Sequence, residues 1–156
     1  MTKGFTIIEL MVVILLIGII TAVGIPRFLR QPVPVTQQFM YKLNVLVTQA
    51  VEQALEQSEP RRIFFNISSS TVEVQEVSGK PIGGSLEMPE EIQVSDVIIN
   101  GVSQFQAGGA KRTFYFLINA EGVSQEVRLL LVEQTPEGPR NFEFLLNPFT
   151  NMFRVA

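Results

Sequence analysis

The order of apolar and polar residues divides the chain into an uninterrupted apolar run, a stretch of helical periodicity and a stretch of alternation. The apolar run covers residues 5–25 and follows a short polar stretch, residues 1–4. A helix of this length would cover roughly 30 Å, the thickness of the hydrocarbon core of a bilayer. The run contains one carboxylate, Glu9, and a charge at the centre of such a helix costs roughly 2.5–3.5 kcal/mol, less near an end. The pattern predicts a membrane-spanning helix over residues 5–30 whose carboxylate needs a cationic partner.

A second helical segment is predicted within residues 31–60. Pro32 and Pro34 should break or sharply kink the chain, and we expect Thr36 to cap the helix that follows. Apolar residues then recur at helical spacing, at Phe39, Leu43, Leu46, Val47, Ala50, Val51, Ala54 and Leu55. This helix should end near residues 58–60. Its apolar stripe should pack on a sheet, although a free partner-binding helix is the alternative interpretation.

Residues 61–156 have the alternation and turn signals of an antiparallel β domain. Strands are predicted around residues 63–67, 72–74, 92–99, 112–119, 125–134, 142–146 and 152–155. Turn signals separate them, at Ser78-Gly79, Gly83-Gly84, Gly108-Gly109, Glu121-Gly122, Glu137-Gly138 and Asn147-Pro148. Residues 79–89 are predicted to be a loop. The fold class is α+β, with a long N-terminal helix packed on an antiparallel β-sheet domain.

Composition argues against an enzyme. The chain has no histidine and no cysteine, which removes the commonest general base, the commonest metal ligand and all thiol chemistry. No Gly-rich phosphate loop or activated nucleophile is recognisable. The formal net charge is −3, which disfavours nucleic-acid binding through bulk charge. We therefore expect no catalytic residues, no cofactor and no resident metal.

Two clusters of charged residues are interpreted as solvated surface. The acidic cluster could in principle offer oxygen ligands to calcium, but a solvated loop explains it better; it comprises Glu87, Glu90, Glu91 and Asp96. The basic residues are sparse and interleaved with acidic ones, which favours solvated strand ends over a DNA-binding surface; they are Arg61, Arg62, Lys111, Arg112, Arg140 and Arg154.

Three interpretations compete for the N-terminal segment. A secretory signal peptide would be cleaved after the apolar run, for which residues 22–24 (Ala-Val-Gly) offer small side chains. A plain single-span anchor explains the length of the run but not Glu9. A leader peptide cleaved before the run would retain the run and would create a new amine beside Glu9.

The third interpretation is supported by a family resemblance. The sequence Gly4-Phe5-Thr6-Ile7-Ile8-Glu9-Leu10 resembles the prepilin cleavage and methylation motif of type IV pilins and type II secretion pseudopilins. The resemblance implies cleavage by a prepilin peptidase between Gly4 and Phe5, N-methylation of Phe5, and pairing of Glu9 with the amine of a neighbouring subunit. Ile25-Pro26-Arg27-Phe28 also resembles the usual end of this segment in the family.

The C-terminal half of the chain resembles one subclass of this family. Residues 114–124 and 144–155 are similar to two hairpin regions of H-type minor pseudopilins (GspH/FimT-like), with Asn151 where many members have glycine. Asparagine tolerates the left-handed conformation that such a turn requires. The resemblance implies a pilin fold and a minor pseudopilin of the periplasmic pseudopilus.

The implied topology has a cytoplasmic N-terminus, an inner-membrane helix and a periplasmic domain that contacts other pseudopilin subunits or secreted cargo. The alternative is a minor type IV pilin of a pilus or DNA-uptake machine, because the N-terminal motif is common to both systems.

Overall fold

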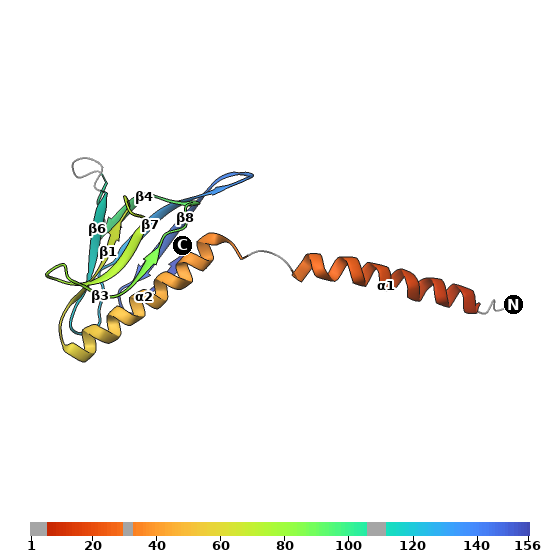
Figure 1. Ribbon diagram of the computed structural model, residues 1–156, viewed down its shortest axis with the longest axis horizontal. Helices are drawn as coiled ribbons and strands as arrows, with labels where there is room; N and C mark the ends of the chain where they lie inside the picture. Colours follow the sequence, from red (N-terminus) through yellow and green to blue (C-terminus); the bar gives the residue numbers. More distant parts are fainter. Residues whose placement is uncertain (1–5, 30–32, 106–111) are drawn as a thin grey trace. The chain divides into compact units, whose positions relative to one another are not determined.

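The computed structural model describes residues 6–29, 33–105 and 112–156, which belong to two compact units, Met1–Val33 and Pro34–Ala156. The first unit contains α1 (Ile7–Leu29). The second contains α2 (Val35–Gln57) and strands β1 to β9 (Figure 1). Helix α1 ends at Leu29 and α2 begins at Val35, so the two helices are separate elements; Pro32 lies outside the described residues.

Helix α1 occupies most of the predicted 5–30 helix. Its apolar side chains between Ile7 and Ala22 are exposed, so this unit buries no core of its own. The hydroxyl of Thr21 donates to the Ile17 carbonyl oxygen at 2.6 Å, which satisfies a polar group on an otherwise apolar surface. Within the three described ranges, no helix combines the length and the apolarity required to cross a membrane.

Helix α2 begins two residues earlier than a Thr36 cap would allow, so that prediction is wrong. Pro34 is the N-cap residue, and its carbonyl oxygen accepts hydrogen bonds from the N–H groups of Gln37 and Gln38. Thr36 lies inside the first turn instead. Its hydroxyl donates to Glu133 at 2.6 Å in a buried contact that fixes the start of α2 to the β domain. Proline disfavours the helical conformation in the residue that precedes it, which explains why the helix does not extend back beyond Pro34.

The end of α2 agrees with the prediction. Ser58 adopts a left-handed conformation with φ 52°, and its N–H donates to the carbonyl oxygens of Ala54 and Leu55. Glu59 N–H also reaches the Ala54 carbonyl oxygen, at 3.2 Å. Pro60 follows, where the helix could not continue.

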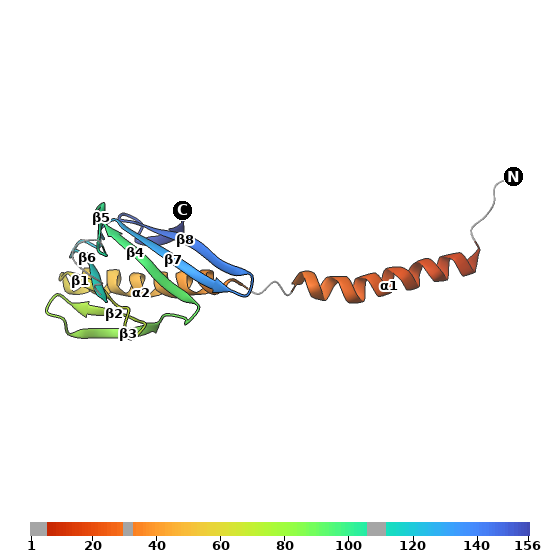
Figure 2. The same cartoon turned by 90° about the horizontal axis from the view of Figure 1, so that it is seen from above.

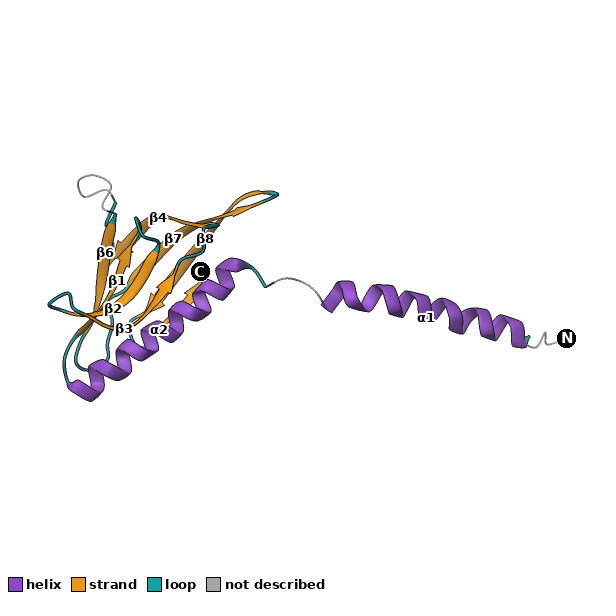
Figure 3. Ribbon diagram, viewed as in Figure 1, coloured by secondary structure: helices purple, strands orange, loops and turns teal. Residues whose placement is uncertain are grey.

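The strands form two antiparallel sheets (Figure 3). The first has the order β3-β2-β1-β6 and contains β1 (Arg61–Asn66), β2 (Thr71–Glu76), β3 (Pro81–Glu87) and β6 (Thr113–Ile118). The second has the order β5-β4-β7-β8-β9 and contains β4 (Ile92–Ile99), β5 (Val102–Ser103), β7 (Val127–Thr135), β8 (Gly138–Asn147) and β9 (Met152–Val155).

Strand β3 replaces most of the loop predicted for residues 79–89, and Gly83-Gly84 lies inside the strand rather than in a turn. Only Ile82 and Leu86 are apolar enough to suggest a buried face, and they are separated by glycines and a serine. The strand is formed by pairing with β2 around a bulge, which tertiary context provides and local sequence does not. Strand β5 was not predicted either. Gly108-Gly109 lies outside the described residues.

The core lies where α2 packs across both sheets (Figure 2). Most of the predicted stripe is buried, which confirms the packed helix; its buried members are Phe39, Leu43, Leu46, Val47, Ala50 and Ala54. Phe65 stacks on Phe114 with ring centroids 4.5 Å apart, and Phe116 meets Phe153 edge to face at 6.2 Å. Burial of these aromatic rings contributes much of the core's apolar area.

Leu55 departs from the predicted stripe because it is 52% exposed. Leu55 and the half-buried Val51 lie beside the turn at Gly122, where an added Cβ would come within 3.3 Å of both side chains. Gly122 also has φ +76°, so two independent constraints favour glycine there. Asn151 has φ 52°, as its place in the hairpin turn predicted, and its side-chain amide donates to the Gly122 carbonyl oxygen at 2.6 Å.

Asn44 protects the open edge of β9. Its side-chain amide donates to the Phe153 carbonyl oxygen at 3.1 Å, and its amide oxygen accepts from the Phe153 N–H at 2.7 Å. One side chain of α2 thus makes the two hydrogen bonds that a neighbouring strand would make, which leaves this part of the edge unable to pair with another chain.

Replacing Asn44 with alanine should lower the free energy of unfolding by about 1–3 kcal/mol, because both Phe153 backbone groups lose their partner. Asn44→Asp should be at least as damaging, since it keeps an acceptor for the N–H but brings a carboxylate toward the carbonyl oxygen. Urea unfolding of the full chain measures the difference, with the exposed Gln49→Ala on the same helix as control. A loss below 0.5 kcal/mol (roughly the effect of a plain surface change) for both Asn44 variants would contradict the edge role.

Candidate functional site

Glu9 lies in the first turn of α1 and forms a reciprocal capping arrangement with Thr6. The Glu9 N–H donates to the Thr6 hydroxyl oxygen, while the Thr6 N–H and hydroxyl donate to the Glu9 carboxylate. Each donor–acceptor distance is 3.3 Å. The first N–H groups of a helix have no partner within the helix, and a Thr-x-x-Glu sequence can satisfy two of them. The contacts are longer than the usual range of about 2.7–3.2 Å, so the carboxylate is held loosely and stays available to a stronger donor.

The surroundings of Glu9 are apolar and exposed. Ile7, Ile8 and Leu10 are exposed by 79%, 75% and 55%, and the large apolar side chains that follow, as far as Ile20, are exposed as well. An exposed apolar surface of this extent marks a place where a helix contacts other proteins or lipid. The predicted processing residues Gly4 and Phe5 lie outside the described residues.

The sequence indicated Glu9 but not its partner Thr6. The signal was present, because Thr6-Ile7-Ile8-Glu9 has the spacing of a capping box ahead of an apolar helix. The sequence-based prediction assigned Glu9 a cationic partner, the amine of Phe5, and did not include this local contact.

The acidic cluster has no geometry for a cation. Asp96 accepts hydrogen bonds from its neighbour's N–H, at 2.7 Å, and from the Ser103 hydroxyl, at 2.8 Å, which ties β4 to β5. Among the residues that the structure describes, no three metal-ligating side chains gather at one point. Asp96 lies within β4, and Glu87, Glu90 and Glu91 precede that strand.

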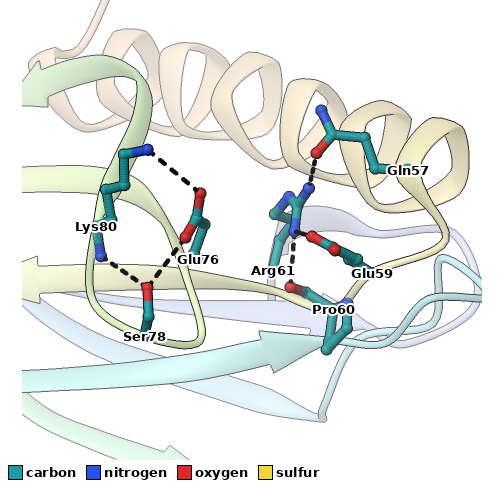
Figure 4. Close-up of polar contacts among 7 residues, drawn as sticks. All are labelled: Gln57, Glu59, Pro60, Arg61, Glu76, Ser78 and Lys80. Atoms are coloured by element: carbon teal, nitrogen blue, oxygen red, sulfur yellow. Dashed lines mark hydrogen bonds and ion pairs between the residues drawn. The ribbon is translucent and has the colours of Figure 1, made fainter.

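Arg61 was predicted to be a solvated strand end, and that is wrong: its side chain is only 1% exposed. Its guanidinium donates to Glu59 at 3.2 Å, to the Pro60 carbonyl oxygen at 3.1 Å and to the side-chain oxygen of Gln57 (Figure 4). These acceptors belong to the last turn of α2 and the link to β1, which the planar guanidinium joins together. The sequence alone could not distinguish this buried arginine from its half-buried neighbour Arg62.

The neighbouring β2–β3 turn is held by its own polar contacts (Figure 4). The Ser78 hydroxyl donates to Glu76 at 3.0 Å, and the Lys80 N–H donates to the Ser78 hydroxyl oxygen at 3.4 Å. Lys80 Nζ also lies 4.0 Å from a Glu76 carboxylate oxygen, an exposed pair of little energetic consequence. Among the predicted basic residues, Arg61 is thus buried and Arg140 pairs with Glu137.

A family model matches the N-terminal segment of the chain. Residues 1–25 match the family model of the prokaryotic N-terminal methylation motif, and this segment contains Gly4, Phe5 and Glu9. No curated protein matches the chain at the level of sequence.

Solved structures of a pseudopilin resemble the fold. A structure of the minor pseudopilin EpsH from the Type 2 Secretion System of Vibrio cholerae aligns with a TM-score of 0.53 and 9% identity, over 79% of this chain and 96% of EpsH. A crystal structure of the same protein aligns with a TM-score of 0.49 and 10% identity, over 75% of this chain and 92% of EpsH.

The fold resembles that of EpsH: it is α+β, and α2 packs on antiparallel sheets, as the sequence predicted. The chain combines this fold with the N-terminal methylation motif that residues 1–25 match.

Proposed function

We propose that this chain is a minor pseudopilin, a structural subunit of the periplasmic pseudopilus of a type II protein secretion system. The observation that carries the proposal is the joint presence of the methylation motif at residues 1–25 and a globular unit with the fold of EpsH. The chain acts by assembly rather than by catalysis, in keeping with its lack of histidine and cysteine.

Processing at the N-terminus creates the charge that Glu9 needs. A prepilin peptidase removes residues 1–4 by cutting between Gly4 and Phe5, and Phe5 is then N-methylated. The new amine is cationic, and in a setting of low dielectric constant an amine and a carboxylate stabilise each other where each alone would be costly. Glu9 pairs with the amine of a neighbouring subunit, so that docking satisfies both charges.

The proposed role also assigns a location and a task to the other segments of the chain. Residues 5–30 anchor the chain in the inner membrane and then form the filament core with other pseudopilin subunits. Lys3 keeps the leader in the cytoplasm, in agreement with the positive-inside rule. Residues 31–60 and the β domain, residues 61–156, lie in the periplasm and contact other pseudopilins or secreted cargo.

Mass spectrometry of the mature N-terminus tests this proposal directly. We expect the chain purified from cells that contain a prepilin peptidase to begin at an N-methylated Phe5. A Gly4→Val variant should keep residues 1–4, because the branched side chain replaces the small residue at the cut. A mature chain beginning at or near Ile25 would show signal-peptide cleavage and would overturn the proposal.

A further inference from the structure

Strand β6 is an edge strand that lacks the protection seen at the other edges. Open edges invite pairing with other chains, and proteins usually blunt them. At the opposite edge of the same sheet, β3 contains Pro81 and two glycines. In the second sheet β5 has only two residues, and β9 is covered by Asn44. Strand β6 has none of these devices over the residues that the structure describes.

The direction of the β6 backbone groups follows from two contacts. Arg112 O accepts from the Ile67 N–H at 2.7 Å, which continues the pairing of β6 with β1. Leu117 faces the other way: its N–H donates to the Gln125 side chain at 2.9 Å, and its carbonyl oxygen accepts from the Gln125 N–H at 3.1 Å. Strand backbones alternate with a period of two, so Thr113 and Tyr115 point to the same open edge as Leu117.

Unlike Leu117, Thr113 and Tyr115 have no hydrogen-bonding partner at the open edge of β6 among the described residues. No described residue makes a hydrogen bond to the outward N–H or carbonyl oxygen of Thr113 or Tyr115. Gln125 thus begins a strand-like pairing along the β6 edge that the rest of the described chain does not continue.

A cleft of ≈ 750 Å³ lies along this edge. One wall is formed by β6 and β1, and the other by Asn100, Val102 and Gln104 at the β4–β5 end of the second sheet. Among the described residues, Arg62 is the only lysine, arginine, aspartate or glutamate that lines it. Its guanidinium lies 5.1 Å from the centre of the Tyr115 ring and donates to the Gln75 side-chain oxygen at 2.9 Å and to the Val77 carbonyl oxygen at 3.5 Å. No carboxylate pairs with it in the described ranges, so its charge is not neutralised there.

We propose that β6 is a docking strand, which binds an extended, acidic segment of a different polypeptide as a fifth strand of the first sheet. The outward groups of Thr113 and Tyr115 supply main-chain hydrogen bonds, and Arg62 receives a carboxylate from the added strand. This surface belongs to the β domain and goes beyond the proposed assembly through Glu9, on which it does not depend.

Charge decides against a second copy of this chain as the occupant. The other edges of a second copy are short, proline-containing or covered, which leaves only its own β6 for pairing. Antiparallel pairing of two β6 strands would leave the charge of Arg62 without a carboxylate in both copies, because no described acidic residue lines this cleft. An acidic strand from another protein supplies the missing carboxylate instead.

Amide hydrogen exchange of the full chain in detergent micelles tests the proposal. The probe is an acetylated and amidated heptapeptide of alternating glutamate and valine. At saturating peptide we expect exchange of the Thr113 and Tyr115 amides to slow at least about tenfold, while Phe114 and Phe116, already paired with β1, stay unchanged. A peptide with lysine for glutamate, and one with N-methylated valines, should give no protection.

Three variants separate backbone pairing from charge. Thr113→Pro removes the outward N–H at a position where an edge strand tolerates proline, and should weaken peptide binding about five- to tenfold; Thr113→Val keeps the N–H and should bind normally. Arg62→Met should weaken binding by a similar factor. Protected Phe114 and Phe116 amides in each variant show that the sheet is intact.

Two results would overturn the proposal. One is the absence of protection at Thr113 and Tyr115 at millimolar concentrations of the acidic peptide. The other is concentration-dependent protection without any peptide, which would make a second copy the occupant.

Discussion

Replacing Glu9 with alanine should leave cleavage after Gly4 largely intact and should reduce incorporation of the chain into filaments at least about tenfold. A tenfold change corresponds to about 1.4 kcal/mol, which is below the cost of roughly 2.5–3.5 kcal/mol for a carboxylate at the centre of a membrane helix. Pairing with a neighbour's amine need therefore recover only part of that cost to select for assembly. The measurement is the ratio of filament-bound to membrane-bound chain after shearing.

The structure suggests how to separate the charge of Glu9 from its local role. The Thr6–Glu9 arrangement stabilises the first turn of α1, so the alanine variant loses both the charge and the cap. Glu9→Gln keeps an oxygen that accepts from Thr6 but carries no charge. Thr6→Val removes the hydroxyl but keeps the carboxylate.

If pairing with the amine drives assembly, Glu9→Gln should lose as much assembly as Glu9→Ala does. Thr6→Val should assemble to within a factor of about three of the unmodified chain, because a helix cap contributes about 1 kcal/mol or less here. All three chains should be cleaved and should have the same helix content by circular dichroism. Normal assembly of the glutamine variant would rule out the charge as the selector.

Sequence periodicity predicted the elements whose side chains alternate between core and solvent. Strand β4 was predicted with the bounds it has, and the end of α2 followed from the polar residues before Pro60. Strand β3 was missed because only Ile82 and Leu86 pack against the core, and the two glycines and the serine between them leave no clear alternation to detect. Its existence depends on β2, a neighbour that only the folded chain provides.

Polar contacts between distant segments were beyond the sequence for the same reason. Thr36 has the residue type of a helix cap, but its hydroxyl meets Glu133, which is 97 positions away. Asn44 falls on a polar position of an amphipathic helix, where nothing distinguishes an edge-capping amide from a solvated one. The contrast between Arg61 and Arg62 is similar, because adjacent residues of a strand face opposite sides of the sheet.

Arg61→Ala should destabilise the second unit by about 2–4 kcal/mol, the largest stability effect that we expect from a polar residue in this chain. The substitution leaves a cavity where the arginine side chain was fully enclosed. It also leaves the Gln57 side-chain oxygen and the Pro60 carbonyl oxygen without their donor. Glu59, at 64% exposed, can be solvated and contributes little to the loss.

Arg61→Met provides the matched control. Methionine fills most of the volume without a charge to desolvate, and apolar replacement of a buried ionic group is often neutral. Its cost should therefore be about 1 kcal/mol, since the two unsatisfied oxygens remain but the cavity does not. Arg61→Lys should fall between the two, because an ammonium keeps the charge but cannot reach several acceptors in a plane.

Tyrosine fluorescence during urea unfolding measures these differences in the full chain. Both tyrosines, Tyr41 and Tyr115, belong to the second unit and there is no tryptophan, so the signal reports that unit and not α1. If alanine and methionine variants were equally destabilised, the cavity would contribute nothing and lost hydrogen bonds would account for the whole effect. If neither lost more than 0.5 kcal/mol (roughly the range of surface changes), the buried guanidinium would not be what joins α2 to β1.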